Sequence, residues 1–306
     1  MSASPATAKT STPLLEDHLD EKHFAAIASL VERRAGIKLP TTKRTMVEGR
    51  LRKRVRCLGL SGLKAYGRHL FDEQGLESEL VHLIDCVTTN KTDFFREPSH
   101  FTFLRDVAVP ELVRQRGARP TNLKIWSAAC STGAEAYTIA MVMQDLLAGS
   151  RTAAQKEIRF SILGTDISTE VLRVARTAVY PSAFVEPVPA PMQQRYLMRS
   201  RDASQDLVRI VPELRRRARF EHLNLMDEAY PFDRDVDVIF CRNVLIYFDR
   251  PTQLAVIARL ASHLRPGGYL LLGHSESMAG SGIPSLRSVG PTIYQAETSS
   301  LRRPSP

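Results

Sequence analysis

The chain has 306 residues, 43% of them hydrophobic, and a formal net charge of +9 at pH 7, which favours an acidic partner. This length allows two folded units, one small and one of ordinary domain size. No apolar run is long enough to span a bilayer and no signal-peptide core is present, so we expect a cytoplasmic protein without direct membrane insertion. The four cysteines lie far apart without a CxxC pair, which favours reduced thiols over disulfides and predicts no metal site.

The two ends of the chain and its first third differ in composition. Residues 1–19 and the tail 298–306 are predicted to be disordered, because Ser, Pro and other small or polar residues dominate them. Between residues 20 and 88 the apolar side chains follow helical spacing, interrupted by Gly and Pro. This segment therefore predicts a helical N-terminal domain of four short helices without a strand.

Residues 43–56 (KRTMVEGRLRKRVR) form a strongly basic helix within that domain. Arg50, Lys53 and Arg54 cluster at helical spacing beside an apolar stripe made of Val47, Leu51, Val55 and Leu58. Such runs are most often solvated faces, but here only Glu48 opposes the positive charge. An acidic docking partner is therefore predicted. No aromatic residues interleave with the basic ones and no nucleic-acid-binding motif is present, so we favour a protein over nucleic acid.

Residues 89–97 are polar and then aromatic, too aromatic for a simple linker, and we expect them to contribute to a functional site. The segment includes Asn90, Thr92 and Arg96. Arg96 follows two phenylalanines, so it is either a solvated residue above a packing cluster or a planar donor that binds a carboxylate. The sequence leaves both interpretations open.

From residue 98 to 297 the pattern predicts an α/β domain. A helix is expected over residues 98–116 and further helices over 132–147, 168–177 and 251–264. Strands are expected at 123–128, 158–164, 219–223, 236–241, 268–273 and near 291–297. Alternation of this kind predicts a Rossmann-like parallel sheet with helices on both faces. Residues 180–217 interrupt it, and their two short apolar runs, RYLMRS and DLVRIV, predict a small antiparallel β-subdomain.

Small side chains follow the strand at 123–128 and lead through Gly133 into a helix that carries Glu135. Such a turn allows the backbone to approach a nucleotide-like ligand. Asp166 ends the next strand, where an acidic residue accepts hydrogen bonds from a ribose, although it could also cap the following helix. The turn lacks GxGxxG spacing, so a nucleoside cofactor other than NAD is predicted.

The strand at 236–241 is followed by Arg242, Asn243 and Tyr247, which we expect at the same edge of the sheet as Asp166. We interpret the polar residues as functional and their apolar neighbours, Val244, Leu245, Ile246 and Phe248, as core. The histidines show no HExxH spacing and no GxSxG motif is present, which argues against a metal site and against hydrolysis.

Six segments, in chain order, resemble the chemotaxis-receptor methyltransferases of the CheR family: TTNKTDFFRE, WSAACSTGAEAY, GTDIS, NLMDEAYPFD, FCRNVLIYFD and GGYLLLGHSE. The resemblance covers residues 20–296. It implies an S-adenosylmethionine (SAM)-dependent protein-glutamate O-methyltransferase that esterifies glutamates on chemoreceptor helices. It also implies a SAM-dependent methyltransferase domain with a β-subdomain, preceded by an all-α domain.

The resemblance also implies roles for particular residues. The cofactor contacts of the family fall on Asn90, Thr92, Arg96, Glu135, Asp166, Asn224, Leu225, Arg242 and Asn243. Arg96 and Tyr247 match residues beside the transferred methyl group, and Arg50, Lys53 and Arg54 lie on the helix that matches the family's receptor-docking face.

The chain departs from the family pattern at Ala134 and Ala136 while it keeps Glu135, so we expect cofactor binding to be retained. The turn at residues 200–206 contains no Gly, which argues against tethering to the C-terminal peptide of a receptor. We expect a monomer. Two alternatives remain: a SAM-dependent enzyme for another acidic substrate, nucleic acid included, and a SAM-binding signalling adaptor of the same fold that lacks catalysis.

Overall fold

The computed structural model describes residues 17–117, 121–149, 158–202, 204–276 and 283–297. They fall into two compact units: one contains the chain up to Arg33 together with Leu39–Val87, and the other contains Arg34–Lys38 and the chain from Thr88 onward. The predicted disorder of residues 1–16 and 298–306 lies outside the described residues.

The first unit consists of helices, and its described residues include no strand. The helices are α1 (Glu21–Ala35), α2 (Arg44–Cys57, after a 3-10 turn at Thr41–Lys43), α3 (Leu63–Phe71) and α4 (Leu76–Val87). Val47, Leu51 and Val55 on α2 are buried as the apolar stripe predicts, whereas Leu58 is half-buried. Four helices over this segment agree with the spacing of its apolar residues.

The prediction of disorder for residues 17–19 is wrong. Leu19 is 1% exposed, and its backbone N–H donates to the Glu48 carboxylate over 3.0 Å. The carboxylate of Asp17 accepts a hydrogen bond from the backbone N–H of Leu63. Composition predicts how much apolar surface a segment can bury by itself, but these residues are fixed by partners that lie far away in the sequence.

The second unit contains a seven-stranded sheet in the order β6-β2-β1-β7-β8-β10-β9. The first five strands in this order run parallel, and β10 pairs antiparallel with both β8 and β9. The strands are β1 (Thr121–Ala128), β2 (Ile158–Asp166), β6 (Ala218–His222), β7 (Val236–Cys241), β8 (Leu264–Leu272), β9 (Leu286–Gly290) and β10 (Ile293–Ala296). The predicted Rossmann-like fold is confirmed. The sequence did not predict β9, whose residues are half-buried or exposed and show no clear apolar alternation.

Three helical segments accompany the sheet: α7 (Ala134–Ala148), α9 (Thr169–Thr177) and α12 (Arg250–Ala261). The helix predicted over residues 98–116 forms α5 (Pro98–Phe103), a π-helical turn (Leu104–Ala108) and α6 (Val109–Arg116). Pro110 explains the wider turn, because proline has no N–H for the helical ladder and its ring crowds the preceding turn.

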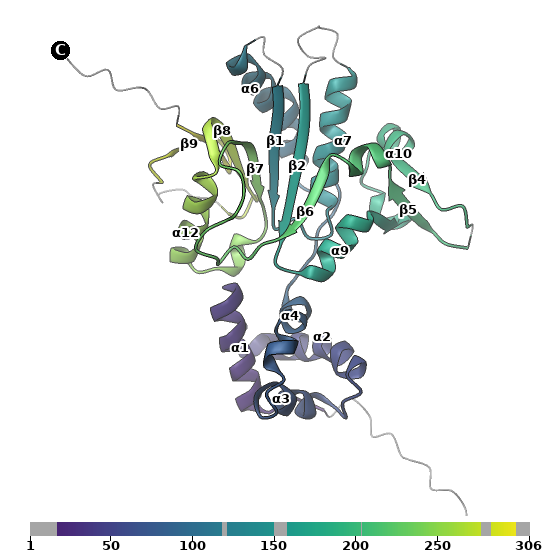
Figure 1. Cartoon of the computed structure of the whole chain (residues 1–306), viewed down its shortest axis with the longest axis vertical. Helices are drawn as coiled ribbons and strands as arrows, with labels where there is room; N and C mark the ends of the chain where they lie inside the picture. The colour runs from purple at the N-terminus through teal and green to yellow at the C-terminus, as the bar shows by residue number, and fades with distance from the viewer. Residues whose placement is uncertain (1–16, 118–120, 150–157, 203, 277–282, 298–306) are drawn as a thin grey trace, which may run out of the picture. The chain divides into compact units, whose positions relative to one another are not determined.

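The predicted β-subdomain is a three-stranded antiparallel sheet in the order β3-β5-β4, and in Figure 1 it lies beside α10, well away from β7 and β8. Strands β4 (Leu197–Arg199) and β5 (Leu207–Ile210) correspond to the two predicted runs. The sequence did not predict β3 (Val179–Pro181) or the short helices α10 (Ala190–Tyr196) and α11 (Pro212–Arg215). Both helices are short and carry proline in their first turn, where proline is tolerated, so the apolar runs alone did not indicate them.

Strand β1 lies at the centre of the parallel part, with β2 and β6 on one side and β7 and β8 on the other. Chain connections therefore run in opposite directions from the β1–β7 pair, and ligands of such sheets bind beyond the carboxyl ends of the strands at this point. All six residues of β7 are buried, as expected of a strand covered on both faces.

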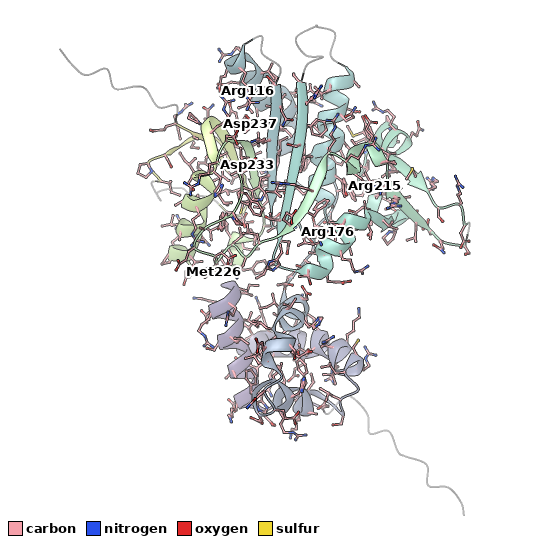
Figure 2. The ribbon with its side chains drawn as sticks, in the orientation of Figure 1. Arg116, Arg176, Arg215, Met226, Asp233 and Asp237 are labelled. Carbon is pink, nitrogen blue, oxygen red and sulfur yellow. The ribbon has the colours of Figure 1, made fainter. Side chains whose placement is uncertain are left out.

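The amino end of β7 carries a buried acid, Asp237, whose side chain is fully shielded from solvent. Its Oδ1 accepts from Arg116 over 2.6 Å and from Arg265 over 3.3 Å, and its Oδ2 accepts from the backbone N–H of Lys124 over 2.8 Å. Figure 2 shows Arg116 and Asp237 together near one end of the sheet, with Met226 near the other. Asp237 thereby fastens α6 and β8 to the start of β7.

Candidate functional site

A pocket lies beyond the carboxyl ends of β1, β2 and β7. It is lined by all ten residues that the sequence places at the cofactor or the methyl group: Asn90, Thr92, Arg96, Glu135, Asp166, Asn224, Leu225, Arg242, Asn243 and Tyr247. Because they come from five separate stretches of the chain, their convergence is a consequence of the fold. Their individual roles remain predictions.

The turn after β1 forms one wall of the pocket. Ala129, Ser131 and Gly133 have φ values of 61°, 49° and 86°, a left-handed conformation that is strained in residues other than glycine. A Cβ on Gly133 would lie 2.9 Å from the Cβ of Ala175, so glycine is also required by close packing. From this tight turn Ala129 and Ser131, and Glu135 in the first turn of α7, line the pocket.

Asp166 is fixed between two turns at the end of β2. Its Oδ2 accepts from the backbone N–H of Ser131 and its Oδ1 from that of Ser168, each over 2.9 Å. The helix cap itself is Ser168, whose hydroxyl accepts from the N–H of Val171. The alternative interpretation of Asp166 as the helix cap is therefore wrong. Asp166 is 7% exposed and lines the pocket.

Arg242 lies between two acids at one end of the pocket. Its Nη1 donates to Glu135 and its Nη2 to Glu97, both over 3.0 Å, and the Arg242 side chain is only 2% exposed. Ser127 donates a further hydrogen bond of 2.7 Å to Glu135. One guanidinium thus faces two carboxylates, and the cluster has a formal charge of −1 when all three groups are ionised.

The two acids respond differently to this environment. Burial raises the pKa of Glu135, and Arg242 and Ser127 offset that effect only in part. Burial also disfavours ionised Glu97, but Arg242, Asn243 and the backbone of His274 outweigh it and hold the pKa of Glu97 below its usual value. Our sequence analysis assigned no role to Glu97, although it directly follows Arg96 in a segment we expected to be functional.

The segment 89–97 combines an aromatic anchor with polar pocket residues, and the role of Arg96 stays a prediction. Phe94 is buried and packs edge-on against Tyr180 at 5.3 Å, whereas Arg96 lines the pocket and donates through Nη1 to the carbonyl of Lys91 over 3.2 Å. The hydroxyl of Ser131 donates to the carbonyl of Asn90 over 2.8 Å. The aromatic residues anchor the segment, and its polar residues face the pocket.

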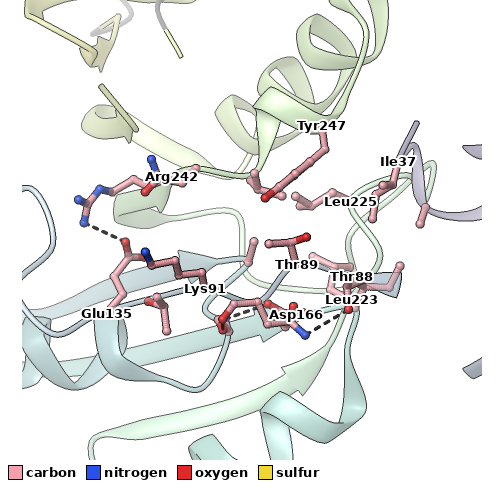
Figure 3. A pocket seen from close by; sticks show the side chains of 18 of the residues that line it. Ile37, Thr88, Thr89, Lys91, Glu135, Asp166, Leu223, Leu225, Arg242 and Tyr247 are labelled. Carbon is pink, nitrogen blue, oxygen red and sulfur yellow. Dashed lines mark hydrogen bonds and ion pairs between the residues drawn. The ribbon is translucent and has the colours of Figure 1, made fainter. Parts of the chain in front are cut away.

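Figure 3 shows that the pocket is charged at one end and apolar at the other. Glu135 and Arg242 occupy the charged end, and Ile37, Leu223 and Leu225 lie near the other. The sequence did not single out several other lining residues: Ala35, Ile37, Thr88, Thr89, Lys91, Asp93, Phe101, Ala129, Ser131, Ile167, Leu223, Val244 and Phe248. Most are small or apolar, so their type alone carries little chemical signal.

Residues 34–38 contribute to the lining of the pocket, although they precede α2 in the chain. Gly36 has a φ of 71°, and a Cβ there would lie 2.7 Å from both Met226 and Phe248. The side chain of Asn224 donates to the carbonyl of Arg34 and accepts from the N–H of Met226. The predicted cofactor contact Asn224 therefore also fastens this short segment to the pocket.

Tyr247 lies in a 3-10 turn, Leu245–Tyr247, and its ring reaches into the pocket. Leu245 and Phe248 are buried as predicted, and Val244 is half-buried. The prediction that Ile246 belongs to the core is wrong, because it is 50% exposed. A short turn directs neighbouring side chains in different directions, which the apolar run VLIYF did not reveal.

The basic helix of the first unit is less free of acids than its sequence suggests. Arg54 donates two hydrogen bonds, of 2.8 and 2.5 Å, to Glu79, a buried acid on α4 whose pKa it lowers. Arg50 donates to the carbonyl of Val87 over 2.8 Å, and Lys53 is exposed. The statement that only Glu48 opposes the charge is wrong, and of the three predicted docking residues Lys53 presents its charge most openly.

One group among the described residues has ligand atoms close enough to hold a metal ion: those of Glu97, His100 and His274 lie within 4.8 Å of one another. Glu97 already binds Arg242, whose charge disfavours a second cation at the same carboxylate. Burial lowers the pKa of His100 to about 4, so this imidazole is neutral at pH 7. The expectation of no metal site stays a prediction.

None of the helices in the described part of the chain has the length and apolar content required to cross a membrane.

Known proteins resemble this chain along nearly all of its length. The CheR methyltransferase all-alpha domain matches residues 22–88, and the CheR methyltransferase SAM binding domain matches residues 90–289. Chemotaxis protein methyltransferase 2 of Pseudomonas aeruginosa is 39% identical over 279 residues, which are 91% of this chain and 94% of that protein.

Two further relatives agree. The chemotaxis protein methyltransferase of Escherichia coli is 40% identical over 85% of this chain and 86% of that protein. That of Borreliella burgdorferi is 34% identical over 92% of this chain and 96% of that protein. The chain therefore belongs to the CheR family of S-adenosylmethionine-dependent methyltransferases.

Proposed function

We propose that this SAM-dependent methyltransferase esterifies glutamate side chains on the helices of chemoreceptors. One observation carries the proposal: Arg96 and Tyr247, which match the family's methyl-site residues, line the same pocket as Asp166 and Glu135. The names of the relatives, chemotaxis protein methyltransferases, support a role in chemotaxis.

The pocket fits SAM in its distribution of charge. Asp166 suits the ribose, because a carboxylate offers about four acceptor positions and two of these already hold the backbone in place. Ile37, Leu223 and Leu225 suit the adenine ring, since they supply an apolar surface at the end remote from Arg242. The Glu135–Arg242 pair suits the amino-acid part, which carries one positive and one negative group.

The chemistry asks little of the protein beyond positioning. SAM supplies a methyl group already activated on a sulfonium, and a glutamate with a pKa of about 4.3 is ionised at neutral pH, so no general base is required. Arg96 orients the acceptor carboxylate through its planar donor fork. Tyr247 narrows the space around the methyl group, which aligns the reacting atoms and excludes water.

The proposed partner is an acidic receptor helix that docks on the basic face of α2. Lys53 is exposed there, and Arg50 lies one helical turn before it. The attraction between such surfaces governs the rate of association and weakens with salt. Arg54 is better explained as a structural partner of Glu79.

Methyl transfer from radiolabelled SAM to membranes that contain the host's receptors tests the proposal. We expect an alkali-labile label on a receptor, as methyl esters require, and Arg96→Ala should reduce the rate by about 100-fold or more, as expected for loss of a positioning group. Arg105→Ala is the matched control, since Arg105 is exposed and paired with its neighbour Asp106. A near-normal rate for Arg96→Ala would remove Arg96 from the mechanism.

Lys53→Glu tests the docking face separately. We expect a raised KM for receptor membranes at low salt, an unchanged Kd for SAM and a smaller difference from wild type at high salt. Equal KM values at low salt would contradict docking on α2.

The same assay separates the alternatives. Label on RNA instead of receptors would identify a methyltransferase for another acidic substrate, and SAM binding without transfer to either would identify a signalling adaptor.

A further inference from the structure

A second buried acid, Glu276, lies just beyond the carboxyl end of β8 and outside the pocket. Glu276 is 7% exposed. Its Oε2 accepts from the backbone N–H groups of Asn243 and Gly273, each over 2.8 Å, and its Oε1 accepts from that of Ile246 over 3.3 Å. A buried carboxylate that accepts three backbone amides joins two separate loops of the chain.

The loop it holds has little regular structure of its own. Asn243 has a φ of 59°, in the left-handed region that Asn adopts more readily than most residues other than glycine. The loop also lacks the ladder of hydrogen bonds that fixes a helix or strand, apart from the short turn Leu245–Tyr247. Glu276 accepts hydrogen bonds from the backbone N–H groups at both ends of the stretch 243–246.

Two further contacts show how tightly the loop is placed. Glu97 accepts from the side-chain amide of Asn243 over 3.1 Å, on the other side from Glu276. A Cβ on Gly273 would lie 2.7 Å from the side-chain nitrogen Nδ2 of Asn243 and 2.7 Å from Glu276 Oε2. Gly273 is therefore the residue that lets the loop, the acid and β8 approach one another.

We propose that Glu276 is a positioning residue for methyl transfer: its carboxylate fixes residues 243–247 so that Asn243 and Tyr247 face the cofactor pocket. The inference rests on the proposed function, because it deepens the role of the same site. Glu276 acts through Tyr247 and does not line the pocket itself.

An amide cannot replace this carboxylate. Three N–H donors converge on its two oxygens, so glutamine would keep one acceptor and turn an NH2 group towards a backbone donor. Glu276→Gln thus changes the hydrogen bonding while the volume stays nearly constant, which is the least disruptive test of the charge and its acceptors.

The experiment compares Glu276→Gln with wild type in three measurements: thermal unfolding, SAM binding by calorimetry, and steady-state transfer to receptor membranes. We expect kcat to fall by about 10- to 100-fold, as a displacement of about 1 Å at a reacting group causes, with a smaller rise in KM for the receptor. Glu111→Gln is the matched control, because Glu111 binds the Tyr269 hydroxyl on β8 over 2.8 Å, away from the loop, and should keep the wild-type kcat.

A double-mutant cycle with Tyr247→Phe distinguishes positioning from stability. The cycle compares how much Glu276→Gln lowers kcat in wild type and in the Tyr247→Phe enzyme. If Glu276 acts through Tyr247, the fold-loss of kcat should be at least threefold smaller in the Tyr247→Phe enzyme, because the effects of coupled residues are not additive. A lower melting temperature with wild-type kcat would overturn the inference, as would fully additive effects.

Gly273→Ala replaces Glu276→Gln in the same measurements if the latter does not fold, because the added methyl group displaces the same loop. We expect the same loss of kcat, and an unchanged kcat would overturn the inference. If wild type itself methylated no receptor, the proposed substrate would be wrong. Calorimetry would still test the inference, because a displaced Asn243 should weaken SAM binding by about threefold or more, as loss of one hydrogen bond does.

Discussion

The two ends of the parallel strands use buried acids in opposite ways. At the amino end, Asp237 is matched by two guanidinium groups, those of Arg116 and Arg265. At the carboxyl end one guanidinium, that of Arg242, is shared between two acids, Glu97 and Glu135. Cations outnumber acids in the group around Asp237, and acids outnumber cations in the group around Arg242. The first arrangement favours stability and the second favours a ligand that carries positive charge.

The largest expected effect comes from removal of the single cation at the carboxyl end. Arg242→Met removes the cation that Glu97 and Glu135 share, and breaking a buried ion pair costs about 3–5 kcal/mol. We expect loss of measurable SAM binding by calorimetry together with a lower melting temperature. Retention of wild-type affinity would show that the shared guanidinium does not organise the site.

Asp237→Asn makes the corresponding change at the amino end. It leaves Arg116 and Arg265 without their charged partner, but their side chains are 21% and 22% exposed and regain some solvation. We expect the free energy of unfolding to fall by about 2–4 kcal/mol, somewhat less than for a fully buried pair. The Kd for SAM should stay within about twofold of wild type, well under the 1.4 kcal/mol of a tenfold change. A large rise in Kd would mean that the two ends are energetically coupled.

A methyl group added at one glycine near each end of the sheet tests the difference between the two ends. Gly133→Ala at the pocket introduces strain at a φ of 86° and a contact of 2.9 Å with Ala175, whereas Gly268→Ala at the amino end meets carbonyl oxygens at 3.0 Å. Both should lower the free energy of unfolding by about 1–3 kcal/mol. Only Gly133→Ala should also weaken SAM binding. Equal SAM affinity in the two variants would contradict the role of this turn.

The smallest effect concerns pH. Because the folded-state pKa of Glu135 is raised, the folded protein binds more protons than the unfolded chain between the usual pKa of glutamate and the raised value. This group therefore lowers stability as pH rises through that window. Its ionised form pairs with Arg242, so we expect SAM affinity to fall severalfold, about 1 kcal/mol or less, as pH decreases through the same window.

Calorimetry of SAM binding at a series of pH values, from the usual pKa of glutamate up to neutral pH, measures this effect. Glu135→Gln should remove the pH step and Asp237→Asn should keep it. A step that persists in Glu135→Gln would assign the titration to another group.

The sequence predicted the sheet and most of the pocket for a physical reason. Parallel strands place their carboxyl ends at one edge, so Asp166 and Arg242 had to converge once their strands were recognised. Glu97 and Glu276 were missed because their roles depend on backbone amides and one guanidinium supplied by distant segments. Arg54 was misinterpreted for a similar reason, since Glu79 lies 25 residues away and meets it only when α2 and α4 pack.

Gly36 shows that the boundary between the two family domains in the sequence is not a boundary in the fold. The all-alpha domain matches residues 22–88, yet Ala35 and Ile37 line the pocket and belong with the second unit. The two matched segments are consequently not independent modules. A shortened protein that starts at residue 88 would lack Ala35 and Ile37, which line the pocket, and the close approach of Gly36 to Met226 and Phe248.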